Sequence, residues 1–298
     1  MSLAHDELSK ILTVEQLPAM PHSALIVLQL DNDVVKVNIN DLVRPIEADL
    51  GLAAQVLKFL NSSYFGFQSS ISNVKQGIAL VGIRIVKNFV LWKAIFSLIP
   101  KSKTGSFDVT LLWQDSLRRA MFTRFLLLEL KKGDPETAFA GALLQDMAIP
   151  LLLKKKPAEY GAVLEQLAAS SGARLSTLEN KAFGWNHADA GAILGKNWKL
   201  PEPLVELVAN HLKIEEIIGN FDQQPEQVVT ALSTLLPSVI NPDWNDRAAF
   251  NKFFAKIMPE NNRLLTTLFD KVDREFDQYA MIIQITKPKK TLFQYLDE

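Results

Sequence analysis

The residues with the clearest capacity for chemistry lie in the stretch Gly141–Pro150, which reads GALLQDMAIP. It is apolar except for the adjacent amide and carboxylate of Gln145 and Asp146. A short aspartate side chain between apolar residues cannot extend to water as a lysine does, so it requires a partner inside the protein. That partner is either a set of hydrogen-bond donors in a buried network or a bound cation.

Three further polar residues interrupt apolar stretches in the same way: Asp115, His187 and His211. Carboxylates and imidazoles are ligands of divalent cations, and a bound cation can lower the pKa of water enough for attack on a phosphoester at neutral pH. Each residue also has a structural interpretation. Asp146 is then a hydrogen-bonded carboxylate, His187 a helix cap or loop contact, and His211 a partner of a helix C-terminus.

The composition excludes several other chemistries. The chain of 298 residues has no cysteine, so disulfides, thiolate metal sites and cysteine nucleophiles are ruled out. No glycine-rich phosphate loop and no H-E-x-x-H motif is present. A formal charge of -1 gives no overall field to attract nucleic acid.

The N-terminus and the longest apolar run indicate where the protein is located. The N-terminus is polar and mixed in charge, unlike a signal peptide. The longest apolar run, Phe89–Pro100, carries Lys93 and is too short to span a bilayer. We therefore expect a cytoplasmic protein with no membrane contact.

The elements that must position these residues are predicted to be helices. Apolar residues recur at helical spacing along the chain, and no sustained alternation indicates strands, so the fold class is all-α. Helices are expected at Arg84–Leu98, Leu111–Leu130 and Ala188–Trp198, with a linker at Lys101–Asp108. We divide the chain into an N-terminal helical part (1–105), a helical core (106–213) and a C-terminal helical extension (214–298).

Arginines also lie on the helix predicted over Leu111–Leu130. Arg118, Arg119 and Arg124 could form a basic stripe there, and solvated surface is the expected environment.

The order of several short motifs resembles the HDOD domain, a branch of the HD superfamily of metal-dependent phosphohydrolases. The resemblance covers roughly Val14 to Leu212. The motifs are Leu17-Pro18 with Pro21, Asn61-Ser62-x-Tyr64-Phe65-Gly66, Ala79-Leu80-Val81-Gly82, Trp113-x-x-Ser116-Leu117, Ala140-Gly141-x-Leu143-Leu144-x-Asp146, Glu179-x-x-x-Phe183-Gly184, His187-Ala188-x-x-Gly191 and Trp198-x-Leu200-Pro201.

The resemblance implies a metal site whose ligands have been replaced. Catalytic HD proteins bind one or two divalent cations through a histidine, a His-Asp pair and a later aspartate. In this chain Asp115 stands at the first histidine, Gln145 replaces the histidine of the pair, and Leu232 aligns with the later aspartate. A carboxamide is a poor ligand for such cations and leucine is none. We therefore expect no catalytic residue, no metal and no other cofactor.

Members of the HDOD branch resemble adaptors, so the implied function is regulation in a bacterial signalling system through other signalling proteins or a small ligand. Asn61, Tyr64 and Phe65 form either a partner-binding groove or a turn packed by its aromatic rings. The alternative is a divergent metal-dependent phosphohydrolase holding a divalent cation. Its weak candidate ligands are Asp115, Asp146, His187 and His211.

Overall fold

The computed structural model describes residues 3–13, 17–30, 37–98, 103–104, 107–170, 172–241, 243–259, 262–283 and 285–297. The first half contains α1 (Leu3–Ile11), α2 (His22–Gln29), α3 (Ile39–Ala48), α4 (Leu50–Leu60), α5 (Val74–Val81), α6 (Ile83–Leu98), β1 (Lys103–Thr104), β2 (Phe107–Asp108) and α7 (Val109–Leu130).

The second half is also helical. It contains α8 (Pro135–Leu144), α9 (Ile149–Lys155), α10 (Pro157–Ala169), α11 (Leu175–Phe183), α12 (His187–Asn197), α13 (Glu202–Asn210), α14 (Ile214–Ile217), η2 (Ile218–Asn220), α15 (Pro225–Ser233), α16 (Arg247–Ile257), α17 (Asn262–Ile283) and η3 (Phe293–Tyr295).

The all-α prediction is confirmed, because the described strands are the two-residue β1 and β2, paired antiparallel. They lie in the stretch predicted as a linker, of which residues 101–102 and 105–106 are outside the described residues. The predicted boundary between residues 105 and 106 is outside them too. The three helices expected from the sequence correspond to α6, α7 and α12.

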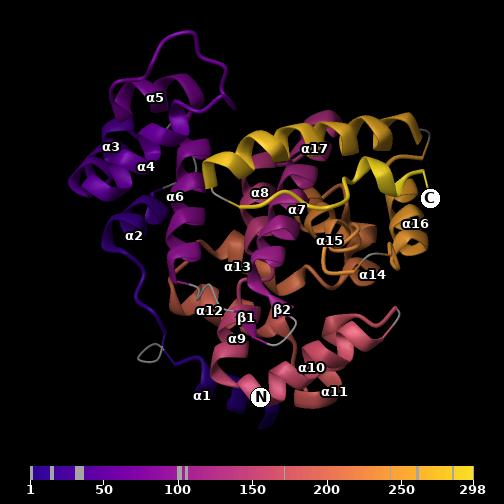
Figure 1. Ribbon diagram of the computed structural model, residues 1–298. Helices are drawn as coiled ribbons and strands as arrows, with labels where there is room; N and C mark the ends of the chain where they lie inside the picture. Colours follow the sequence, from indigo (N-terminus) through magenta and orange to yellow (C-terminus); the bar gives the residue numbers. More distant parts are fainter. Residues whose placement is uncertain are drawn as a thin grey trace.

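The centre of the fold is α7, which is buried around most of its circumference. Its first turn is capped by Asp108, and it ends at Lys131 in the left-handed conformation. It packs against α8, α15 and α17, and α8 in turn packs against α6 and α13 (Figure 1). Residues that face different sides of α7 can therefore reach both the middle and the C-terminal helices.

The C-terminal residues complete this core and do not form a separate layer. In Figure 1, α15 lies beside α7 and α17 runs across it, and α15 also packs against α8 and α13. Large aromatic side chains of α16 and α17, including Phe250 and Phe269, are fully buried. The helices after residue 213 thus share one hydrophobic core with α7.

The N-terminal lobe consists of α2 to α5, at the upper left of Figure 1. Asp49 caps α4 by accepting the Leu52 N–H at 3.0 Å, and the same carboxylate accepts the Ser23 hydroxyl at 2.9 Å. This residue therefore ties α2 to the start of α4.

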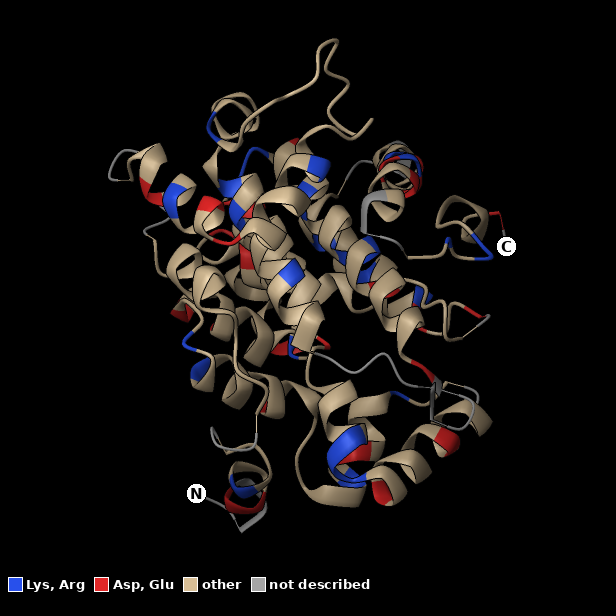
Figure 2. Cartoon of the chain, turned by 60° about the vertical axis from the view of Figure 1, so that its left-hand side comes forward, with Lys and Arg blue, Asp and Glu red and all other residues tan. Residues whose placement is uncertain are grey.

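The distribution of charged residues and the burial of the most apolar stretch both follow from the structure. Acidic and basic positions are interspersed along the outer helices in the view of Figure 2, as the near-zero net charge leads one to expect. The stretch Pro135–Lys155 is long and apolar enough to cross a membrane by composition, but it forms α8 and α9, and 89% of its apolar 18-residue window is buried inside the fold.

Candidate functional site

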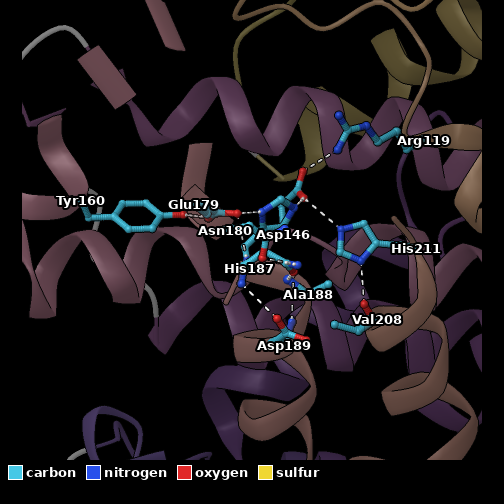
Figure 3. Close-up of polar contacts among 11 residues, drawn as sticks. Arg119, Asp146, Tyr160, Glu179, Asn180, His187, Ala188, Asp189, Val208 and His211 are labelled. Carbon is cyan, nitrogen blue, oxygen red and sulfur yellow. Dashed lines mark hydrogen bonds and ion pairs between the residues drawn. The ribbon is translucent and has the colours of Figure 1, made fainter. Parts of the chain in front are cut away.

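Asp146 lies in the turn between α8 and α9, almost fully buried, and its partner is Arg119 of α7. The guanidinium donates from Nη1 to Asp146 Oδ2 in a short, direct ion pair (Figure 3). The neighbouring Gln145 joins it, because its amide oxygen, in the orientation that satisfies both groups, accepts from Arg119 Nε at 3.3 Å and Nη1 at 3.0 Å. The partner that the sequence requires for Asp146 is thus an arginine.

His187 opens α12 and lies between two carboxylates. Its Nδ1 is 2.6 Å from Glu179 Oε2, and its Nε2 is 3.5 Å from Asp146 Oδ1. Burial disfavours the charged ring, but the carboxylates of Glu179 and Asp146 outweigh it and raise the pKa of His187. Of the two structural interpretations of His187, a helix cap or a loop contact, the cap is wrong: Asn186 is the N-cap, and its side chain accepts the Ala188 N–H at 2.9 Å.

Glu179 is the residue that fixes His187. It is completely buried on α11 and accepts the His187 backbone N–H at 3.0 Å and the Tyr160 hydroxyl in a short hydrogen bond. Gly184 ends α11 with φ of +75°, a conformation that a residue with a Cβ adopts reluctantly. The chain reverses there, so the side chain of Glu179 faces the ring of His187 (Figure 3).

His211 follows the last turn of α13 and presents a neutral acceptor. Its Nδ1 is 2.6 Å from the Val208 carbonyl oxygen, so Nδ1 carries the proton and Nε2 the lone pair. Burial and the nearby His187 lower the pKa of His211 to about 3. Its Nε2 is 3.8 Å from Asp146 Oδ1 and has no hydrogen-bond partner among the described residues. The expected contact with the helix C-terminus is confirmed.

Two glycines allow these elements to meet. Gly141 on α8 lies against Leu207, and Gly191 on α12 lies against Val208, both of α13. An added Cβ at either position would overlap the α13 side chain. The close approach brings Asp146, His187 and His211 together.

The donor atoms of Asp146, His187 and His211 all lie within 4.8 Å of one another. In each histidine the opposite ring nitrogen is held, by Glu179 in one case and by the Val208 carbonyl in the other. Metal-binding histidines are oriented in the same way by hydrogen bonds behind the ligand. Two imidazole nitrogens and one carboxylate oxygen fit a single first-row divalent ion. The positive charge of Arg119, which is paired with the other oxygen of Asp146, opposes the binding of such an ion.

Asp115 does not join this cluster. Its carboxylate accepts the Ser238 hydroxyl in a short hydrogen bond and the Val239 N–H at 2.9 Å, which holds the segment after α15 against α7. Burial outweighs Arg119 and these hydrogen bonds and raises the pKa of Asp115. Leu232 is fully buried in α15. Of the four ligands considered under the enzyme alternative, three converge and Asp115 is engaged elsewhere.

A cavity of about 510 Å³ opens above the cluster. Arg119, Asp146, His187 and His211 line it together with two segments, residues 167–170 with 172–176, and residues 234–238 with 240–241 and 243–246. Arg174 and Asp246, which also line the cavity, form an ion pair of 2.6 Å that joins these two segments. More than a third of the residues that line the cavity therefore lie beyond α14.

Asn61, Tyr64 and Phe65 form the aromatic-packed turn that was one of the two expectations. The amide of Asn61 donates to Ile71 O at 2.8 Å and accepts the Ile71 N–H at 2.7 Å, which closes the loop. The Tyr64 hydroxyl accepts from Arg124 Nη1 at 2.9 Å, and the ring of Phe65 packs edge-on against Phe59. A partner-binding role for this turn stays a prediction.

The expectation that Arg118, Arg119 and Arg124 lie on solvated surface is wrong. Arg118 is 2% exposed and donates to the Lys290 carbonyl, whereas Arg124 forms a 2.6 Å ion pair with Glu136. The side chain of Arg119 is 13% exposed. The available signal was the apolar sequence next to two of them, Ala120-Met121-Phe122 after Arg119 and Phe125-Leu126-Leu127 after Arg124, where a charged residue needs a partner.

Comparisons with known proteins agree with this architecture. The HDOD domain model matches residues 17–214, about two thirds of the chain. An HDOD domain protein with unknown function from Geobacter sulfurreducens superposes with a TM-score of 0.72 at 19% identity, covering 93% of this chain and 95% of that one.

Two further crystal structures have the same fold. A protein of Marinobacter aquaeolei VT8, provisionally named a signal transduction protein, has a TM-score of 0.72 at 18% identity. The match covers 94% of this chain and 65% of the Marinobacter chain. A protein of Shewanella amazonensis SB2B, provisionally named a phosphohydrolase, has a TM-score of 0.64 at 18% identity over 95% and 93% of the two chains. The matches to curated relatives span 41% and 23% of those relatives' lengths.

Proposed function

We propose that this chain, which belongs to the HDOD family, is a non-catalytic regulatory protein that acts through a small ligand and through contacts with other signalling proteins. The observation that supports it most is the pairing of Arg119 with Asp146. The carboxylate that an HD enzyme uses to bind a cation already has a positively charged side chain on it.

The residues at the other replaced ligand positions also support a non-catalytic role. Gln145 uses its amide oxygen to hold Arg119, and Asp115 uses its carboxylate to hold Ser238 and Val239. Metal-assisted hydrolysis needs a cation with an open coordination position and an attacking water. Here the groups at the replaced positions are committed to internal contacts, so they are not available to complete such a site.

The cavity above Arg119 suits a small ligand. Its volume of about 510 Å³ lies within the range of small-molecule sites, and its lining combines apolar side chains with charged and polar ones in similar proportion. A ligand there would contact both α7 and the lining residues that follow α15, such as Leu235 and Trp244. Because α17 packs on α7, occupancy could be transmitted to the C-terminal helices.

The experiment has two arms on the purified chain. Monoester and diester phosphate substrates with Mg²⁺, Mn²⁺ or Zn²⁺ should not be hydrolysed. A small-molecule thermal-shift screen should yield ligands that stabilise the wild type and fail to stabilise Leu235→Trp, which fills the cavity. Turnover that Asp146→Asn abolishes would overturn the proposal.

The second candidate is a metal-dependent phosphohydrolase with one ion, and the observation that favours it is His211 Nε2. This buried acceptor faces Asp146 Oδ1 without a hydrogen-bond partner in the described chain. Asp146, His187 and His211 would hold the ion, and a bound ion of this kind lowers the pKa of water. The similarity to the Shewanella amazonensis protein shows the fold alone, so activity is decided by the assay above.

A further inference from the structure

We propose that Arg119 is a resident counter-ion that excludes divalent cations from the site formed by Asp146, His187 and His211, so that its removal exposes a one-ion metal site. This inference rests on the proposed function in one respect: Arg119 takes the place of the cation that an HD enzyme binds. It adds that the remaining donors are still arranged to bind one.

First, the two carboxylate oxygens of Asp146 have different neighbours. Oδ2 pairs with Arg119, whereas Oδ1 faces the Nε2 atoms of His187 and His211 at 3.5 and 3.8 Å. A divalent ion bound at Oδ1 would lie a few ångströms from the guanidinium. Both groups are nearly excluded from water, so the repulsion between them would be weakly screened.

The second step is the completeness of the donor set without Arg119. Both Nε2 atoms point toward the same carboxylate oxygen because Glu179 and the Val208 carbonyl hold the opposite ring nitrogens. The lone pair of His211 Nε2 is buried and has no hydrogen-bond partner among the residues that the structure describes. Three such donors at one point are what a Zn²⁺ or Co²⁺ site requires, with a solvent-facing position left open toward the cavity.

The third step separates a specific effect of Arg119 from a change in overall charge. Arg174 lines the same cavity but pairs with Asp246, and Asp146 does not contact it in the ion pairs described. Replacing Arg174 removes the same charge from the cavity without uncovering Asp146. Arg174→Met is therefore the matched control for Arg119→Met.

The experiment titrates Co²⁺ into the full, tag-free chain by calorimetry, with the visible Co²⁺ spectrum as a second readout of nitrogen ligation. Arg119→Met should bind one ion per chain at least about a hundredfold more tightly than the wild type. Arg174→Met should resemble the wild type, and the double variant Arg119→Met with His211→Phe should lose the gain. Equal affinity of Arg119→Met and wild type, an equal gain in Arg174→Met, or a gain that survives His211→Phe would overturn the inference.

Because Arg119→Met leaves a buried carboxylate without its counter-ion, folding needs its own measurement. If the variant is unstable, saturating Co²⁺ should raise its melting temperature, and it should not raise that of the double variant. Absence of that rise would also overturn the inference. Arg119→Lys, which keeps the charge, should bind Co²⁺ no better than the wild type.

The two proposals fail in different ways. Hydrolysis of a phosphoester by the wild type would overturn the proposed function whatever the Co²⁺ titrations give. Tight Co²⁺ binding by a wild type without turnover would overturn the inference about Arg119 and leave the regulatory proposal standing.

Discussion

Replacing Glu179 by glutamine should destabilise the fold strongly, although the two side chains have nearly the same shape. The carboxylate is fully buried and accepts hydrogen bonds from Tyr160 and from both the backbone and the ring of His187. The amide of glutamine has one acceptor oxygen, and its NH₂ group would face a donor. Removing one partner of a buried charged pair costs about 3–5 kcal/mol. Because some hydrogen bonds survive in the variant, we expect a loss of about 3 kcal/mol.

That loss is measured by urea unfolding followed by circular dichroism, and for a chain of 298 residues it corresponds to a fall in melting temperature of roughly 5 °C. Glu165→Gln is the control, because Glu165 is an exposed glutamate on the neighbouring helix α10. Glu179→Gln should also lower the pKa of His187, which nitrogen-15 NMR of the ring reports. A stability within about 0.5 kcal/mol of the control, with the His187 pKa unchanged, would refute the reasoning.

Two further predictions concern a helix cap and a buried imidazole. Asp49→Ala should cost about 1 kcal/mol by removing the cap of α4 and the tie to Ser23, and an unchanged melting temperature would contradict this. The pKa of His211 is lowered to about 3 in the fold, below its unfolded value. The unfolded chain therefore binds a proton that the folded chain does not, and stability should fall as the pH is lowered from about 6.5 toward 3. His211→Phe should reduce the slope of unfolding free energy against pH by up to about 1.4 kcal/mol per pH unit, and equal slopes would count against the assignment.

The helical architecture followed from the sequence because it depends on local spacing. α6, α7 and α12 each show apolar residues at helical intervals, and the motifs that resemble the HDOD domain are short local patterns spread from Leu17 to Pro201. The need of Asp146 for a buried partner was equally local, since the residues on both sides of the Gln145-Asp146 pair are apolar.

The identity of that partner could not be read from the sequence. α7 is buried around most of its circumference, so helical periodicity does not indicate which face of it meets the turn after α8. Arg119 reaches Asp146 because α7 packs against α8, a contact set by tertiary packing.

The role of Asp115 was hidden for a related reason. Its partners, Ser238 and Val239, are more than 120 residues away in the chain, beyond the part that resembles the family. Glu179 was recognised as a motif residue, but its position against His187 depends on the reversal at Gly184. Contacts of this kind require the fold itself.

The most direct measurement is the metal content of the wild-type chain. The protein is incubated with equimolar Zn²⁺, Mn²⁺ and Mg²⁺, dialysed without chelator, and analysed by mass spectrometry of the elements. Because Arg119 already neutralises Asp146, we expect far less than one ion per chain. One tightly held ion per chain, lost in Asp146→Asn and in His211→Phe, would contradict the account.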